Sequence, residues 1–195
     1  AIIKQGNHTY GIINLPSFYV NFNNTRERNS ASDMALEIAK LKKQNVDGLI
    51  VDLRNNGGGS LSKVVEIAGL FIKEGPVVQV RDAERNIQVL SDTDSSTQWD
   101  KPLVILINEL SASASEILAA AMQDYGRAII IGSKQSYGKG TVQELIDLNR
   151  EIRNSSLGDL GAIKLTRQKF YRINGGSTQL KGVNSDVVIP DRYQY

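Results

Sequence analysis

A serine beside a predicted helix start is the first residue in this sequence that could do chemistry. Ser111, Ser113 and Ser115 alternate in NELSASASEILAAAMQDYG, residues 108–126, directly before a run of helix formers. Ser113 and Glu116 match the Ser-x-x-Glu capping box, in which the serine only satisfies backbone N–H groups. The same position suits a nucleophile, because free N–H groups and the positive end of the helix dipole stabilise an alkoxide. Both interpretations of Ser113 stay open at this point.

A serine nucleophile also needs a base that accepts its proton. The single histidine, His8, lies in a polar, turn-like context and is a poor candidate. Lys139 is flanked by Gly138 and Gly140 in SYGKGT, so the backbone there can approach other segments closely. Burial that lowers a lysine pKa by roughly three units from about 10.4 makes the amine a base near neutral pH. Ser-Lys pairs of this kind are known, and an exposed loop lysine is the alternative for Lys139.

A glycine-rich segment follows a predicted buried strand. DLRNNGGGSL, residues 52–61, places Gly57, Gly58 and Gly59 between this strand and a helix. Glycines in such a turn allow backbone N–H groups to point at an anion, as in an oxyanion hole. A plain glycine turn is the other interpretation.

Two further polar residues lie near the candidate pair in the sequence. Gln143 follows Lys139 by four residues, and its amide could orient the amine. A fully extended chain would separate the two by about 13 Å, so this role requires a bend at Gly140. Asp124 lies on the same predicted helix face as Ser113 but about 16 Å further along, so we expect it to bond groups near the helix end as structural support.

An alternation of strands and helices must position these residues. Helical spacing of apolar residues predicts helices over 33–44 and 60–72, and continuous β-rich runs predict buried strands over 48–54 and 102–108. The sequence also predicts a strand over 9–16, a hairpin from 76–82 and 87–92, strands over 128–132 and 162–173, a loop over 133–141, an exposed excursion over 149–161, and a segment over 142–148 that is ambiguous between strand and helix. The pattern predicts a single α/β domain with several parallel crossovers.

Composition excludes several classes of protein. With 41% hydrophobic and 23% charged residues, the 195-residue chain resembles an ordinary globular domain. Its net charge of +2 comes from interspersed charges, so nucleic acid is not an expected partner. The longest apolar runs are far too short for a membrane span, and without cysteine no disulfide forms. The first residues lack the pattern of a secretory signal, which fits a cytoplasmic protein or a mature or excised piece of an exported one.

Two functions compete with catalysis by Ser113. The segment AIIIGSKQSYGKGT partly matches a phosphate-binding loop, but five residues separate Gly132 from Gly138 where that motif has four. Gly140 also stands where the motif needs a hydroxyl that holds magnesium, so a nucleotide hydrolase is disfavoured. A binding or scaffold module on a related fold, with a serine that merely caps, is the stronger alternative.

Three segments in this order resemble the peptidase core of the carboxyl-terminal processing proteases, the S41 serine peptidases, and above all their tail-specific branch: VDLRNNGGGSL, NELSASASEILAAAMQDYGRA and SYGKGTVQ. The resemblance extends to QKFYRINGGSTQ and KGVNSDVVIPD near the end of the chain. It implies that Ser113 is the nucleophile and Lys139 the general base, with Gln143 orienting the lysine. It further implies an oxyanion hole made by the backbone N–H groups of Gly59 and Ala114, with Gly58 and Asp124 as supporting residues.

The same resemblance implies a fold and a setting. The fold is the open spiral of strands and helices shared with crotonase and the Clp peptidase, and neither a metal nor an organic cofactor is implied. Substrates would be exported or envelope proteins recognised by their C-terminal tails, brought in some cases by an adaptor protein, in the periplasm or cell envelope. Relatives carry a PDZ domain, and no segment here resembles one, so residues 1–195 are expected to form the catalytic core alone.

Overall fold

A six-stranded sheet forms the centre of the molecule. The computed structural model describes residues 1–21, 24, 27–152 and 158–191. The strands lie in the order β1-β2-β3-β6-β7-β10. Their bounds are β1 Ile2–Gln5, β2 His8–Asn14, β3 Gly48–Asp52, β6 Leu103–Ile107, β7 Ile129–Gly132 and β10 Val187–Val188. Apart from the antiparallel β1–β2 pair, every neighbouring pair is parallel, as the crossover pattern predicted.

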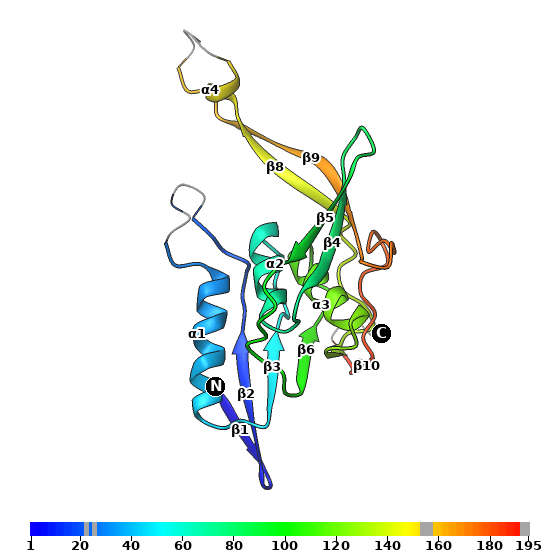
Figure 1. The fold of residues 1–195 in the computed structure, drawn as a ribbon. Helices are drawn as coiled ribbons and strands as arrows, with labels where there is room; N and C mark the ends of the chain where they lie inside the picture. Colours follow the sequence, from blue (N-terminus) through cyan, green and yellow to red (C-terminus); the bar gives the residue numbers. More distant parts are fainter. Residues whose placement is uncertain (22–23, 25–26, 153–157, 192–195) are drawn as a thin grey trace.

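Three helices connect the parallel strands and form a layer of their own. They are α1 Ser30–Lys43, α2 Leu61–Gly69 and α3 Ala114–Asp124, and α2 contacts both of the others. The apolar face predicted for the first helix is confirmed, because Met34, Ile38 and Leu41 are buried. Helix α3 is buried from Ala114 to Met122, and α2 lies between α1 and α3 in this layer (Figure 1). No helix in the described part of the chain is long and apolar enough to cross a bilayer.

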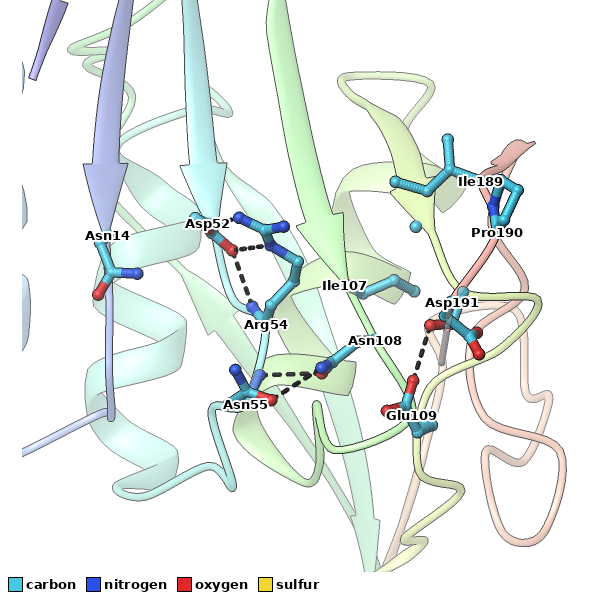
Figure 2. A pocket seen from close by; sticks show the side chains of 12 residues that line it. Asn14, Asp52, Arg54, Asn55, Ile107, Asn108, Glu109, Ile189, Pro190 and Asp191 are labelled. Atoms are coloured by element: carbon cyan, nitrogen blue, oxygen red, sulfur yellow. Dashed lines mark hydrogen bonds and ion pairs between the residues drawn. The ribbon is translucent and has the colours of Figure 1, made fainter. Parts of the chain in front are cut away.

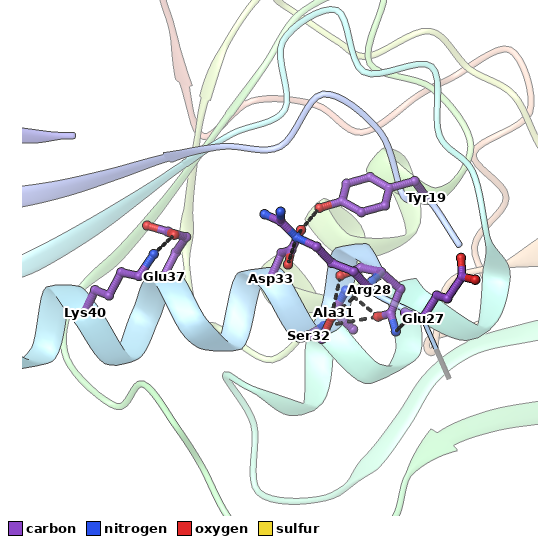
Figure 3. A network of polar contacts seen from close by, with 9 residues as sticks. Tyr19, Glu27, Arg28, Ala31, Ser32, Asp33, Glu37 and Lys40 are labelled. Carbon is purple, nitrogen blue, oxygen red and sulfur yellow. Dashed lines mark hydrogen bonds and ion pairs between the residues drawn. The ribbon is translucent and has the colours of Figure 1, made fainter. Parts of the chain in front are cut away.

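Helix α1 begins earlier than its apolar spacing predicted, because of local capping. The Asn29 side chain accepts hydrogen bonds from the N–H groups of Ala31 and Ser32, each at 3.1 Å. In the same turn Asp33 accepts hydrogen bonds from Arg28 and from the Tyr19 hydroxyl (Figure 3). Burial and the hydrogen bond to Asp33 raise the pKa of Tyr19 to about 12. This network attaches the segment before α1 to the helix.

A second, antiparallel sheet of four strands lies beside the helix layer. Its order is β5-β4-β9-β8, with β4 Gly75–Arg81, β5 Ile87–Asp92, β8 Thr141–Asp147 and β9 Ala162–Tyr171. The predicted hairpin of β4 and β5 is confirmed, and the ambiguous segment is the strand β8, because β9 pairs with it along its whole length. The far end of β8 and β9 projects from the body as an arm that carries α4, Leu148–Glu151 (Figure 1).

The predicted excursion lies at the tip of this arm. Residues 149–152, 158, 159 and 161 are exposed, whereas 153–157 lie outside the described residues. At the other end of the arm, Phe170 of β9 is buried in the core. The hairpin is thus anchored at its base, and this base borders the candidate active site.

Candidate active site

Ser113 lies at the start of α3 in an unusual backbone conformation. Its φ is 58° and its ψ is −113°, whereas a helix N-cap ordinarily has an extended backbone. A positive φ is uncommon for any residue other than glycine, and such strain persists only where the surrounding structure enforces it. Of the predicted capping box, the bond to the glutamate is present, because the Ser113 N–H donates to Glu116 Oε2 at 2.8 Å. This bond alone does not require the strained conformation, so a simple cap does not account for Ser113.

The two neighbouring serines have structural roles. The Ser111 hydroxyl donates to the carbonyl of Leu53 at 2.9 Å, and the Ser115 hydroxyl donates to the carbonyl of Asn56 at 2.8 Å. Both serines are fully buried. They hold the start of α3 against the segment that follows β3. Of the three alternating serines, only Ser113 remains partly exposed and lines a cavity.

The glycine-rich segment lies directly against Ser113. The Gly58 N–H donates to the buried Asn56 side chain at 2.8 Å, which fixes the turn. Gly58 has a φ of +105°, and a Cβ there would lie 2.7 Å from the Ser113 Cβ. Gly59 has a φ of +143°, and a Cβ there would lie 2.3 Å from the Phe18 carbonyl oxygen. Both positions therefore require glycine.

Among the described residues, the backbone N–H groups of Gly59 and Ala114 are free of protein acceptors. Both residues line the cavity that contains Ser113. Unbonded N–H groups beside a hydroxyl are what an oxyanion requires.

A cavity of about 250 Å³ brings the predicted site residues together. The lining of this cavity combines polar groups with apolar side chains. The lining residues are Gly57, Gly59, Leu61, Ser113, Ala114, Ile117, Lys139, Val142, Gln143, Lys164 and Phe170. The predicted nucleophile, base, orienting residue and oxyanion donors therefore surround one space. His8 is not part of this lining and lies beside Asp47 at the start of β2.

Lys139 is half-buried in this wall, with its side chain near Gln143. The distance from Lys139 Nζ to Gln143 Oε1 is 3.5 Å, so the extended-chain separation does not apply. Val142 and Gln143 both line the cavity although they are consecutive, because the register of β8 against β9 shifts between them. Burial lowers the pKa of Lys139, the charge of Lys164 lowers it further, and the charge of Glu116 opposes both effects.

Glu116 is the site residue that the sequence did not reveal beyond its place in the capping box. It is fully buried, and its Oε2 accepts hydrogen bonds from the N–H of Ser113 at 2.8 Å and from the N–H of Lys139 at 2.9 Å. Its Oε1 accepts from the Ser136 hydroxyl and the Gly138 N–H, each at 2.7 Å. Burial raises the pKa of Glu116, and these four hydrogen bonds counteract that rise. One carboxylate thus joins the backbone of Ser113 to that of Lys139.

The same bonds weigh against a phosphate-binding loop. Such a loop needs backbone N–H groups that point at the phosphate. The N–H groups of Gly138 and Lys139 are instead bonded to Glu116. The arrangement therefore favours a site built around Ser113 over a site that binds the phosphates of a nucleotide.

Asp124 lies at the far end of α3 and does not line the cavity. Its carboxylate accepts two hydrogen bonds from Arg172, at 2.6 and 3.0 Å, and one from Asn174 at 2.9 Å. Both partners follow β9. The expectation that Asp124 bonds groups near the helix end is confirmed, and it attaches α3 to the second sheet.

A larger cavity, of about 450 Å³, lies at the carboxyl ends of the parallel strands (Figure 2). Its polar side chains bond one another: Arg54 donates two side-chain hydrogen bonds to Asp52, and Asn55 pairs with Asn108. It contains no serine paired with a lysine or histidine. Among the described residues, no group of three or more His, Asp or Glu side chains is placed to hold a metal ion.

Comparison with known proteins points in one direction. The model of "Peptidase family S41" matches residues 9–189. The tail-specific protease of Haemophilus influenzae is 48% identical over 188 residues, which are 96% of this chain and 26% of the relative. The carboxy-terminal-processing protease of Bartonella bacilliformis is 37% identical over 161 residues, which are 80% of this chain and 35% of the relative.

Solved structures agree with the sequence comparison. The photosystem II D1 C-terminal processing protease superposes with a TM-score of 0.74 at 30% identity, over 93% of this chain and 42% of that protein. An S41 protease of Bacteroides fragilis, at 16% identity, shares the fold with a TM-score of 0.76. The chain thus spans 26% to 49% of the length of these proteins, which is less than half in each case.

Proposed function

The chain belongs to peptidase family S41, and from this premise we propose that it is the catalytic core of a serine endopeptidase with Ser113 as nucleophile and Lys139 as general base. The observation that supports this proposal most strongly is that both side chains line one cavity while a single buried carboxylate bonds both backbones. The strained φ of Ser113 adds to it, because strain of this kind is concentrated at functional sites.

In the proposed mechanism, the Ser113 hydroxyl attacks the carbonyl carbon of a substrate peptide bond and Lys139 Nζ accepts the hydroxyl proton. The carbonyl oxygen becomes an oxyanion that accepts hydrogen bonds from the N–H groups of Gly59 and Ala114. Lys139 then donates the proton to the leaving amine as the C–N bond breaks, which leaves an acyl ester on Ser113. A water molecule, deprotonated by Lys139, hydrolyses this ester and the Ser113 hydroxyl regains its proton.

Four residues assist without taking part in bond making. Gln143 orients the Lys139 amine, and Glu116 fixes the separation of the Ser113 and Lys139 backbones. Gly58 leaves the space that Ser113 occupies, since a side chain there would collide with it. Asp124 acts at a distance, through the attachment of α3 to the second sheet.

The substrate class follows from the cavity and from the relatives. Leu61, Ile117, Val142 and Phe170 give the cavity an apolar floor, which suits an apolar side chain next to the cleaved bond. A substrate strand would pair with an edge of a sheet, because backbone hydrogen bonding accepts many sequences. The names "tail-specific" and "carboxy-terminal-processing" of the relatives support protein tails as substrates.

The setting is also part of the proposal. Family likeness supports exported or envelope proteins as substrates, a periplasmic or envelope location, and an adaptor as a further partner. We treat residues 1–195 as the peptidase core, with tail recognition assigned to other regions of such proteases.

Replacement of the nucleophile tests this function. Ser113→Ala should abolish cleavage of an internally quenched peptide, with a rate loss of at least about a thousandfold. Ser62→Ala on the exposed side of α2 is the matched serine control and should cleave normally. Circular dichroism should show that both variants are folded. Cleavage by Ser113→Ala at the rate of the unsubstituted chain would support the scaffold alternative instead.

A further inference from the structure

Lys164 is a second cation at the cavity and has no role in the mechanism above. It lies on β9 opposite Leu145 of β8. Leu145 is two residues beyond Gln143, and alternate residues of a strand share a face. Lys164 therefore lies on the same face of the arm as Gln143, and both line the cavity with Lys139.

The acidic residues of the arm do not neutralise Lys164. Glu144 is on the opposite face and pairs with Arg167 at 3.0 Å. Asp147, nearer the tip, pairs with Arg150 and caps α4. Within the described residues Lys164 forms no ion pair, and no carboxylate lines the cavity.

An unpaired ammonium in this position disfavours a second positive charge nearby. The groups with an electrostatic effect on Lys139 are Lys164 from β9 and Glu116 from α3, and their effects are opposite. Glu116 supports the site geometry, but its charge favours a protonated Lys139. Burial, which lowers the pKa of Lys139 most, and the charge of Lys164 together oppose the effect of Glu116, so Lys164 adds to what burial does in making Lys139 a base.

We propose that Lys164 is a positioning residue of the site: its ammonium at the cavity rim keeps the Lys139 amine in the uncharged form that accepts a proton. This inference rests on the proposed function, because an uncharged Lys139 matters only if Lys139 is the general base. The electrostatic coupling between the two lysines can nevertheless be measured without any cleavage.

Competitive acetylation measures this coupling directly. The chain is treated with a trace of acetic anhydride at a series of pH values, and mass spectrometry follows modification of Lys139, since only the neutral amine reacts. Lys164→Met should raise the midpoint of this titration by about half a unit to one unit. Lys164→Arg keeps the charge and should leave the midpoint in place. Lys169→Met is the matched control, because Lys169 of the same strand lines a different cavity.

The rate profile provides the second readout. In Lys164→Met the acid limb of the pH profile of kcat/KM should move to higher pH by the same interval. For an amidated peptide without acidic residues, kcat/KM should therefore fall about three- to tenfold on that limb and stay unchanged on the plateau. An unmoved Lys139 midpoint would overturn the proposal. The proposal would also be overturned if Lys164→Met changed only KM, and only for peptides with a free carboxylate, because Lys164 would then bind substrate. Cleavage by Ser113→Ala would refute the proposed function and leave the acetylation result standing.

Discussion

At the scale of single residues, the geometry of the site depends on Glu116 as much as on the two residues it joins. A buried carboxylate with four donors around it fixes the loop after β7 and the start of α3 in one arrangement. Each of these donors loses its hydrogen bond with water when the chain folds, so each needs a carboxylate oxygen as its new acceptor. The sequence pointed to Ser113 and Lys139 as candidate site residues and to Glu116 only as a capping residue; the folded chain shows that Glu116 bonds the backbones of the other two.

Glu116→Gln should impair both stability and rate. The glutamine side chain keeps the shape of glutamate but replaces one acceptor oxygen with an NH2 donor. This donor would face either the N–H groups of Ser113 and Lys139 or the Ser136 hydroxyl and the Gly138 N–H. We expect the free energy of unfolding to fall by about 1–3 kcal/mol and kcat to fall with little change in KM. Urea denaturation and steady-state kinetics measure the two effects, with Glu37→Gln on the exposed side of α1 as control. An unchanged kcat would show that Glu116 does not position the site.

Gly58→Ala tests the close approach of the glycine-rich segment to Ser113. The added Cβ meets the Ser113 Cβ at 2.7 Å, and the backbone at φ +105° is strained for alanine. A displacement of Ser113 by a fraction of an ångström should lower kcat/KM about a hundredfold. Gly57→Ala has open space around its Cβ and should lose far less. Equal rates for the two variants would contradict the role given to Gly58.

At the scale of elements, α3 is fixed at both ends. Its start is bonded to the segment after β3 and to the Lys139 loop, and its end is attached to the chain after β9 by Asp124 and Arg172. The register shift of β8 against β9 between Val142 and Gln143 completes the arrangement, because both of these residues line the cavity. The helix therefore aligns the parallel sheet with the second sheet.

Asp124→Asn should act through this attachment. Loss of the charge weakens the bidentate pair with Arg172, and we expect a loss of about 1–3 kcal/mol in the free energy of unfolding. The rate of peptide cleavage should fall only to the extent that the substitution displaces α3. The Arg172→Gln variant should have a similar effect, and the double variant should lose less than the sum of the two. A catalytic loss without any loss of stability would instead indicate a direct role for Asp124.

At the scale of the whole molecule, some features follow from local sequence patterns and others do not. The strands β2, β3, β6 and β7 were predictable because β-rich segments alternate with amphipathic helices, whereas the short, exposed strands β1 and β10 were not predicted. The antiparallel sheet was only partly predictable, since β4 pairs with β9 across a long stretch of chain and periodicity carries no information on such partners. For the same reason β8 was ambiguous in sequence, and the contact of Gln143 with Lys139 could not be inferred from an extended chain.

The role of Lys139 as the base that accepts the Ser113 proton is tested by cleavage of the quenched peptide by Lys139→Ala with and without added ethylamine. We expect a loss of about a hundredfold to ten-thousandfold in rate and a partial recovery when the free amine enters the vacated space. Lys139→Arg should stay inactive, because its guanidinium remains protonated. Cleavage by Lys139→Ala at the full rate in the absence of amine would show that Lys139 is not the base.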